Sequence, residues 1–244
     1  MEAWEDQAII LSARPYGEGA VAHVLTAHRG KRAGYVYGSR AALEPGTLAA
    51  ARWQARGAEF LGTLSLEPLK AHAPLLGHDA ARLAALASAC ALLDAGLAER
   101  EPAPGAFEGL CALLSIISRE ESVDPWLLWP AAYVFWEVQL LDALGFALDL
   151  EACAAGGDGP LTHVSPRTGR AVSAQQAEPY EAKLLKLPGF LRPERAAPAP
   201  EDILGGLALT GYFLEHRAFA QDTRGLPAAR ARLLAALGGM RTSA

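Results

Sequence analysis

Basic and aromatic side chains lie close together in one short stretch of the N-terminal part of this 244-residue chain. The stretch contains four cations and two tyrosines: Arg29, Lys31, Arg32, Arg40, Tyr35 and Tyr37. Cations that follow a phosphate backbone, beside aromatic rings on which bases stack, are the means by which small β-barrels hold single-stranded nucleic acid. The same residue types also form ordinary solvated walls of sheets, so the stretch alone leaves both interpretations open.

A second stretch repeats the mixture of apolar and basic residues with a period of two. Its two alternating sets are Ala51, Trp53 and Ala55, and Arg52, Gln54 and Arg56. In a β-strand, alternate side chains point to opposite faces, so this pattern predicts one buried and one polar face. Arg52 and Arg56 would then extend a track of cations on the outside of the sheet.

The elements that must position these residues are short β-like runs separated by turn residues. There are five such runs before about residue 76: 7–14, 20–27, 31–39, 48–56 and 62–70. Five consecutive runs with turns between them predict a small closed or nearly closed antiparallel sheet. In the third run, Gly34 and Val36 alternate with Tyr35 and Tyr37, which places the two tyrosines on one face.

From Leu76 onward, the spacing of apolar residues is typical of helices. Helices are predicted over 78–98, 106–119, 125 to about 145, 175–187, 200–219 and 227–237. Pro130 is expected to kink the third of these or to delay its start. The glycine-rich segment 153–170 predicts a loop or small hairpin. The predicted fold class is therefore α+β with two domains, 1–76 and 77–244, and a short insertion at about 151–174.

Composition and charge exclude two classes of protein. The chain is 51% hydrophobic, which is too apolar for a disordered protein, and its net charge of −5 excludes binding to nucleic acid through bulk positive charge. The charge is unevenly distributed: residues 1–78 hold 8 Lys and Arg against 7 Asp and Glu, whereas residues 79–244 hold 14 against 20. A polyanion is therefore expected to prefer the N-terminal part.

The sequence also gives expectations about compartment. The longest stretches without a charge are 12 residues, 125–136 and 203–214, whereas a bilayer-spanning helix needs about 18 or more. The first six residues are acidic where a secretory signal would be basic. Three scattered cysteines do not suggest a disulfide framework. We therefore expect a cytoplasmic protein that does not associate with membranes.

Sequence signatures of catalysis are missing. The run 156–159 lacks the Lys and Ser or Thr of a phosphate-binding loop, no Gly-x-Ser-x-Gly turn occurs, and the six histidines form no two-histidine zinc motif. Cys90 and Cys111 fall on apolar helical faces and are interpreted as core residues. We therefore predict no enzyme and no cofactor, while a serine or cysteine nucleophile assembled only by folding stays open.

The order of several phrases resembles the RecO family of bacterial recombination mediators. In the N-terminal part the phrases are 4–11 (WEDQAIIL), 14–18 (RPYGE), 24–31 (VLTAHRGK) and 34–40 (GYVYGSR). In the C-terminal part they are 141–146 (LDALGF), 150–153 (LEAC), 164–172 (VSPRTGRAV) and 226–230 (LPAAR). The resemblance spans nearly the whole chain.

This resemblance implies an N-terminal OB-fold, a helical C-terminal domain and an insertion that often carries zinc. It implies binding and annealing of single-stranded DNA, and duplex DNA is a further possible ligand. It also implies cooperation with RecR, with single-stranded DNA-binding protein and, indirectly, with RecA, and thus a place at the nucleoid. The alternative is a scaffold whose barrel binds RecR and contacts DNA only within that complex.

In two respects the chain departs from the family pattern. Many members carry four cysteines in the insertion, whereas only Cys153 stands there in this chain, so we predict that no structural zinc is bound. The family docks the acidic tail of single-stranded DNA-binding protein on the helical part, but the central helix reads YVFWE at 133–137, without a basic pair. The candidate cations for the tail are Arg82, Arg119, Arg217 and Arg230.

Overall fold

A computed structural model describes residues 2–38, 43–57, 60–103, 105–119, 125–194 and 196–240, without the side chains of 125–127 and 240. The described residues divide into two compact units. The first contains the residues up to Arg119 together with Pro227–Gly239, and the second contains those from Pro125 to Leu226. The predicted domain boundary near residue 76 stays a prediction.

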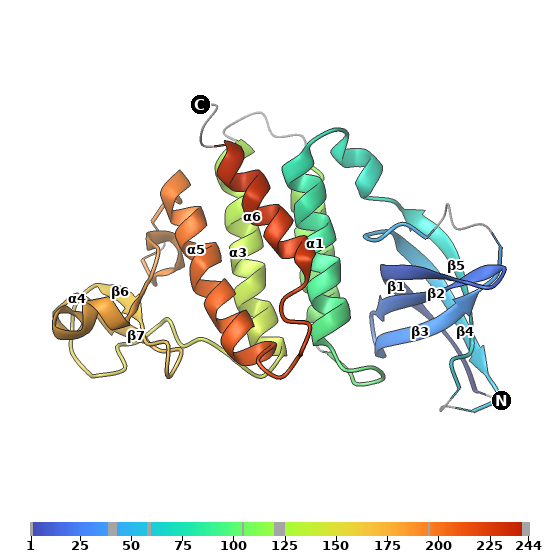
Figure 1. Ribbon diagram of the computed structural model, residues 1–244, viewed down its shortest axis with the longest axis horizontal. Coiled ribbons are helices and arrows are strands. Elements are labelled where there is room, and N and C mark those ends of the chain that lie inside the picture. Colours follow the sequence, from blue (N-terminus) through green and yellow to red (C-terminus); the bar gives the residue numbers. More distant parts are fainter. Residues whose placement is uncertain are drawn as a thin grey trace. The chain divides into compact units, whose positions relative to one another are not determined.

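The first unit begins with a five-stranded sheet (Figure 1). Its strands are β1 (Glu2–Tyr16), β2 (Gly19–Thr26), β3 (Gly30–Val36), β4 (Leu48–Ala55) and β5 (Thr63–Lys70). The hydrogen-bonded order β1-β2-β3-β5-β4 returns to β1 and closes the sheet into a barrel. All pairings are antiparallel except that of β3 with β5, which is parallel and consists of the single pair Tyr35 and Thr63. The predicted five strands are confirmed.

Strand β1 is longer than the predicted run because it serves two neighbours. Its first half, Glu2–Ile9, pairs with β4, and its second half, from Ala8 onward, pairs with β2. The register with β2 shifts between Ile10 and Ser12, which marks a β-bulge. A bulge bends the strand and increases its twist, and this bend lets one strand close both sides of the barrel.

Alternating side chains fill the barrel interior. Trp4 and Trp53 are cross-strand partners, and their rings stack at 5.7 Å with 13° between the planes. Both are buried. The indole Nε1 of Trp53 donates hydrogen bonds to the carbonyls of Ala33 (3.1 Å) and Leu61 (3.0 Å), so this ring also fixes the segment that leads into β5.

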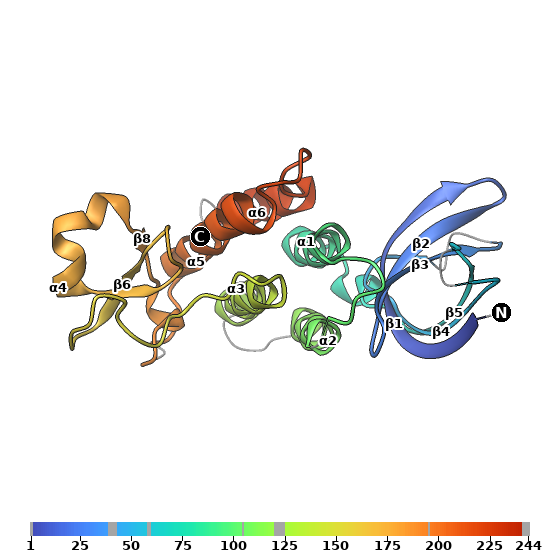
Figure 2. The same ribbon diagram turned by 90° about the horizontal axis from the view of Figure 1, so that it is seen from below.

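Helices α1 (Ala80–Gly96), α2 (Ala106–Ile117) and most of α6 (Ala228–Met240) complete the first unit. The side chain of Asp79 caps α1 by accepting hydrogen bonds from the amides of Ala81 and Arg82, each at 3.0 Å. Helix α1 contacts β1 (Figure 2), and the Cys90 thiol lies 3.9 Å from the carbonyl of Ile10. Cys90 is 1% exposed, which confirms its interpretation as a core residue, and this burial raises the pKa of its thiol to about 12.

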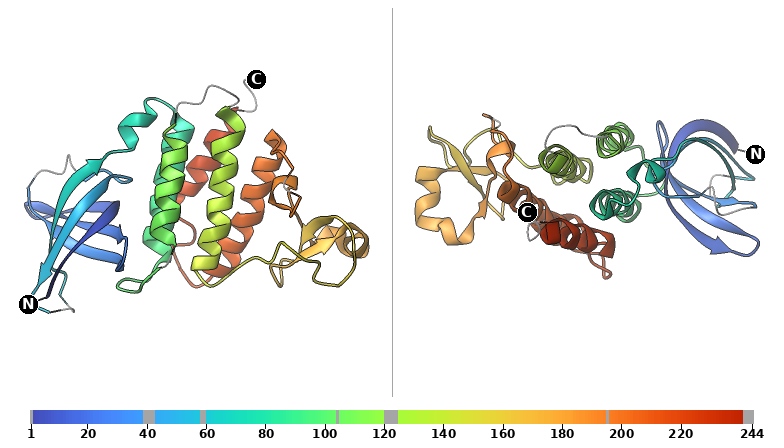
Figure 3. Two further views of the ribbon diagram at one scale, coloured as in Figure 1. Left: turned by 180° about the vertical axis from the view of Figure 1, so that it is seen from behind. Right: turned by 90° about the horizontal axis from the view of Figure 1, so that it is seen from above.

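The second unit contains two packed helices and a small sheet. Helix α3 (Pro125–Ala143), which continues through Pro130, lies beside α5 (Pro200–Phe213) in Figure 3. Gly206 permits this close approach, because a Cβ there would meet Cγ1 of Val134 at 2.8 Å. The three strands pair in the order β7-β6-β8, with bounds Leu161–Val164 (β6), Ala171–Ser173 (β7) and Leu185–Lys186 (β8). Short helical segments connect these elements: α4 (Ala174–Ala177), η3 (Glu178–Lys183), η4 (Gly189–Leu191) and η5 (Leu214–Ala218).

The predicted helix over 175–187 is confirmed as helical structure up to Lys183 and is wrong from Leu184 onward. Only α4 and η3 are helical there, and Leu185–Lys186 pair instead with β6. Pro179 lies in the first turn of η3 and cannot donate the amide hydrogen bond that would continue α4 as an α-helix. The first part of the glycine-rich segment has no regular structure, and β6 then pairs with β7 in an antiparallel hairpin. That residues 151–174 are an insertion stays a prediction.

The loop after α1 is fixed to the start of β3. The Arg100 amide donates a hydrogen bond to the carbonyl of Lys31 at 2.9 Å, and the bridge is completed by Glu99. Gly30 makes this approach possible: its φ is +66°, and a Cβ there would lie 1.8 Å from the carbonyl oxygen of Glu101. Glycine alone fits a left-handed position with backbone this close.

Replacing Gly30 by alanine is therefore expected to lower the free energy of unfolding by about 2–4 kcal/mol. The left-handed conformation contributes about 1–2 kcal/mol of this, and displacement of the loop contributes the rest. Urea unfolding measures the change. Gly17→Ala is the matched control, because Gly17 also has a positive φ, +55°, but no atom lies within 4 Å of the added Cβ. Equal losses in the two variants would contradict the close approach.

Candidate nucleic-acid interface

The predicted polar face of β4 exists. Arg52, Gln54 and Arg56 are exposed, whereas Ala51, Trp53 and Ala55 are buried in the barrel. Strand geometry alone produces this separation, since successive side chains alternate between the two faces. Arg52 and Arg56 are therefore placed on one outer surface, as the sequence predicts.

The strand register brings residues from all five strands into one row across this surface. Directly paired positions share a face, and the pairs run Arg14–Val21–Tyr35–Thr63–Gln54–Ala3. The row crosses the barrel at the β3–β5 pair, where the Tyr35 amide also donates to the carbonyl of Gly62 at 2.9 Å. Tyr35 thus lies on the same outer surface as Gln54, and Arg14 lies two positions from Tyr35 along the row.

Three tyrosines form an aromatic cluster around Tyr35. Its ring meets that of Tyr37 at 4.7 Å and 84°, and that of Tyr16 at 6.3 Å and 80°. Tyr37 is 72% exposed and Tyr16 is 67% exposed, which is unusual for such large apolar rings and leaves their faces open to a ligand. The predicted first strand ends at residue 14 and therefore leaves out Tyr16. Continuing the alternation two residues beyond Arg14 would have included it.

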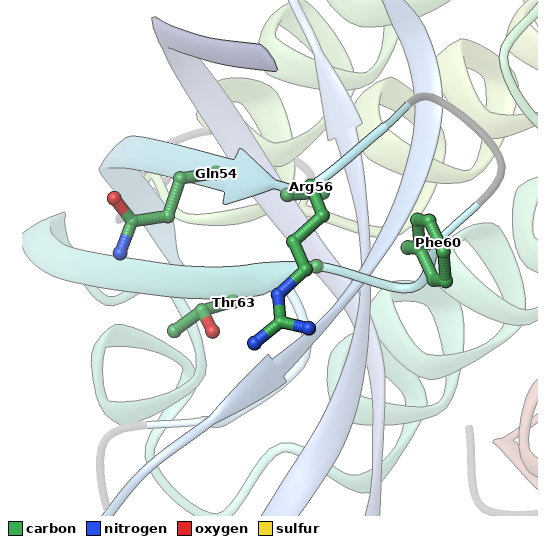
Figure 4. A pocket seen from close by; sticks show the side chains of 6 residues that line it. Gln54, Arg56, Phe60 and Thr63 are labelled. Atoms are coloured by element: carbon green, nitrogen blue, oxygen red, sulfur yellow. The ribbon is translucent and has the colours of Figure 1, made fainter. Parts of the chain in front are cut away.

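A hollow lies beside the cluster on the same surface. It has a volume of about 510 Å³ and is lined by Gln54, Ala55, Arg56, Phe60, Gly62 and Thr63. Figure 4 shows the labelled side chains projecting toward it from β4, β5 and the segment between them. A second hollow of about 470 Å³ shares Gln54 and Thr63 and extends to Arg52 and Ser65. Together with the three tyrosines, these two hollows form a strip that we call the outer strip.

Arg29 and Arg32 lie at the end of the barrel near Trp4. The guanidinium carbon of Arg29 is 5.7 Å from the centroid of the Trp4 ring, a cation–π distance, and Nε of Arg32 donates to the carbonyl of Arg29 at 3.1 Å. Burial lowers the pKa of Arg32, and the nearby charges of Arg100 and Arg29 lower it further. Arg100, which lies far from Arg32 in the sequence, is therefore close to it in the fold.

Lys31 differs from the other predicted cations. The residue is 7% exposed, and its Nζ donates a hydrogen bond to the carbonyl of Asp94 on α1 at 2.5 Å. Its neighbour Gly30 holds the loop after α1, so this end of β3 faces the helices. The placement does not favour the predicted contact of Lys31 with a phosphate. Arg40 lies outside the described residues, so the role predicted for it stays a prediction.

The charge of Arg52 is partly compensated. Its Nε lies 3.0 Å from Oε1 of Glu5, the residue opposite it on β1, and both side chains are more than 70% exposed. An exposed ion pair of this kind contributes little to stability and exchanges readily with another anion. Arg56, by contrast, has no carboxylate partner among the described residues and lines the hollow directly.

Ser12, His23 and Asp94 meet between the barrel and α1. The Ser12 hydroxyl donates to Oδ2 of Asp94 at 2.7 Å, and Nδ1 of His23 lies 2.6 Å from Oδ1. These are the residue types of a nucleophilic triad, but both polar groups bind the carboxylate and no bond between Ser12 and His23 is described. In a triad the histidine must bind the serine. The two contacts instead tie β1 and β2 to α1, and we call these three residues the clamp.

The four candidate cations for an acidic tail differ in availability. Arg82 donates to the carbonyls of Ile117 and Arg119 and lies 3.2 Å from Asp79, and Arg230 is 4% exposed. Arg217 donates to the carbonyl of Arg167 at 2.6 Å. Arg119 is exposed. Arg82, Arg119 and Arg230 belong to the first unit and Arg217 to the second.

Cys153 is the one cysteine in the glycine-rich segment 153–170. The thiol exchanges hydrogen bonds with the amide (3.3 Å) and hydroxyl (3.5 Å) of Ser173; although burial acts to raise the pKa of Cys153, these bonds lower it overall. In the described part of the chain, no three histidine, cysteine, aspartate or glutamate side chains are placed to hold a metal ion. That zinc is not bound stays a prediction.

Comparison with known proteins agrees with the class that the fold defines, a five-stranded barrel followed by helices. The family model for the N-terminal part of recombination protein O matches residues 1–71, and the model for its C-terminal part matches residues 77–225. The chain therefore belongs to the recombination protein O (RecO) family.

Several relatives align with nearly the whole chain. The DNA repair protein RecO of Rhodospirillum centenum is 49% identical over 95% of this chain and 93% of its own length. The proteins of the same name from Rhodospirillum rubrum and Caulobacter vibrioides (strain NA1000 / CB15N) are 45% and 44% identical, each over 96% of its length. The described helices include none with the length and apolarity needed to cross a bilayer.

Proposed function

We propose that this chain acts in DNA repair and recombination by binding and annealing single-stranded DNA, and that it helps RecR to load RecA in gap repair. Membership of the RecO family supports the repair role. The observation that carries DNA binding is the row across the barrel, which joins an exposed tyrosine cluster to Arg56 and Arg52 through Thr63 and Gln54.

The barrel is proposed to be an OB-fold. Its strand order, with a parallel β3–β5 pair between otherwise antiparallel strands, supports this assignment. In such barrels, a single strand lies across the sheet surface, with phosphates near cations and bases stacked on rings. Tyr35 and Tyr37 would supply the stacking surfaces, and Arg56, Arg52, Arg29 and Arg32 the phosphate contacts.

Annealing would follow from the charges alone. Two complementary strands repel each other through their phosphates, and cations that neutralise part of this charge reduce the repulsion. The proposal contains no bond-breaking step, so the protein is proposed to act without catalysis. We further propose that the tail of single-stranded DNA-binding protein docks on the helical part, with exposed Arg119 as one cation for its carboxylates.

A salt titration tests the proposal. Affinity for a fluorescent single strand should fall with a log–log slope of roughly −0.7 for each phosphate contacted, so that four to six contacts lower affinity roughly 20- to 100-fold when salt is tripled. Arg56→Ala should reduce the magnitude of this slope by about 0.7. Arg232→Ala, an exposed arginine on α6, is the control and should leave the slope unchanged.

Adding RecR separates the two proposed modes of action. If the isolated chain binds the strand and Arg56→Ala weakens that binding, the proposed function is supported. If the isolated chain does not bind at low salt but a complex with RecR does, the barrel acts as a scaffold and the proposal is wrong.

A further inference from the structure

Three arginines gather at one end of the barrel, outside the outer strip. Arg29 and Arg32 are joined by the hydrogen bond from Nε of Arg32 to the carbonyl of Arg29. Arg100 arrives from the loop after α1, which is held in place by its amide bond to Lys31. The charge of Arg100 acts on Arg32 more strongly than that of any other residue. We call this group the arginine cluster.

The positive charge of the arginine cluster is not neutralised by direct pairing. In the part of the chain that the structure describes, none of its three guanidinium groups has a carboxylate within ion-pair distance. Glu2 and Glu99 lie near enough to act on Arg32 electrostatically, but each forms no described ion pair with it. Three like charges held together without a directly paired carboxylate favour binding of an anion.

The position of Arg100 is fixed by a conformation that arginine rarely adopts. Its φ is +67°, and it is the one described residue other than glycine with a positive φ. That conformation is less favourable for a residue with a Cβ than for glycine. The backbone at position 100 is therefore one that glycine would adopt more easily than arginine.

Arg100 also links the arginine cluster to the outer strip. Its Nη2 donates a hydrogen bond to the carbonyl of Phe60 at 3.3 Å. Phe60 lines the hollow that contains Arg56, and its ring is 52% exposed. The exposed Phe60 thus lies between the arginine cluster and Arg56. A single strand of DNA offers phosphates and bases in alternation, and this order of cation, ring and cation matches it.

We propose that Arg29, Arg32 and Arg100 form a second phosphate-binding site, from which a bound single strand passes over Phe60 to Arg56. The inference rests on the proposed function, because the strand that it extends is the one proposed for the outer strip. Guanidinium groups suit this task, since they bind phosphate oxygens in a bidentate manner and stay charged when partly buried. The phosphate is either an internal diester or a 5′-terminal monoester.

Arg100→Gly is the most informative variant. It removes the guanidinium, and because glycine accepts a positive φ freely, the backbone at position 100 can keep its conformation. Affinity for a fluorescent oligothymidine of about 20 nucleotides should nevertheless fall about fivefold at 0.1 M salt, and the salt slope should decrease by about 0.7. Arg29→Ala should have the same effect on the slope, and Arg232→Ala none.

The outcomes separate failure of this inference from failure of the proposed function. If the wild-type chain binds and Arg56→Ala weakens it, but Arg100→Gly leaves affinity and slope unchanged, the second site does not exist. If the wild-type chain itself does not bind the strand, both proposals fall. Oligonucleotides with and without a 5′-phosphate distinguish the source: a loss in Arg100→Gly only with the phosphorylated strand identifies a terminal monoester, and equal losses identify diesters.

Discussion

A variant in which Tyr35 is replaced by leucine and Tyr37 by alanine should bind single-stranded DNA roughly 30-fold more weakly or worse. Each ring that stacks on a base contributes about 1–3 kcal/mol, so two rings contribute at least about 2 kcal/mol. Tyr37 is 72% exposed, and its ring is in edge-to-face contact with that of Tyr35. Leucine at position 35 keeps apolar bulk on the barrel wall.

The salt dependence of this variant separates stacking from charge. Because tyrosine contacts release no counter-ions, the log–log slope should stay at the wild-type value while the affinity falls. Arg56→Ala should do the reverse and reduce the slope. Tyr180→Ala is the control, since Tyr180 is 61% exposed in the second unit, and it should bind like the wild-type chain. A double variant with unchanged affinity would show that bases do not stack on this cluster.

Replacing Asp94 by alanine should destabilise the first unit by about 2–4 kcal/mol. The carboxylate accepts the hydrogen bonds of Ser12 and His23, and its side chain is only 14% exposed. Removing a partly buried charged acceptor leaves both partners without their bond, and such losses are at the large end for point substitutions. Urea unfolding measures the effect, and Asp158→Ala, an exposed aspartate in the glycine-rich segment, should change stability little.

The same carboxylate should make stability sensitive to acid. Burial acts to raise the pKa of Asp94, but the hydrogen bonds from His23 and Ser12 outweigh it and the folded-state pKa is lowered. A lowered pKa gives stability that is complete above the unfolded value of about 3.9 and is lost as the pH falls through the folded value. Wild-type stability should therefore drop more steeply below about pH 4 than that of Asp94→Ala. Parallel curves would contradict the clamp.

Alternation made the outer face predictable. Ala51, Trp53 and Ala55 point into the barrel. Because side chains alternate along a strand, Arg52, Gln54 and Arg56 point outward and are exposed. The same alternation predicts that Tyr35 and Tyr37 lie on one face, and their rings are in contact. The five strands and the long helices were also predictable, since their periods of two and 3.6 extend over many residues.

Long-range contacts were not predictable from local pattern. Lys31 looks like its neighbours Arg29 and Arg32 in the sequence, yet its ammonium is buried against α1 because this end of β3 faces the helix. Arg100 is distant from all three in sequence and reaches them only through the backbone bridge to β3. The predicted helix over 175–187 ends at Lys183 and is followed by a strand, β8, whose pairing with β6 no local signal indicates.

The order of the two units along the chain has a consequence for synthesis. Pro227–Gly239 belongs to the same compact unit as the barrel, although the whole second unit is translated in between. A ribosome therefore releases most of the first unit long before its final segment, and domains tend to fold as units while the chain is emerging. The first unit therefore cannot be complete until translation has passed residue 239.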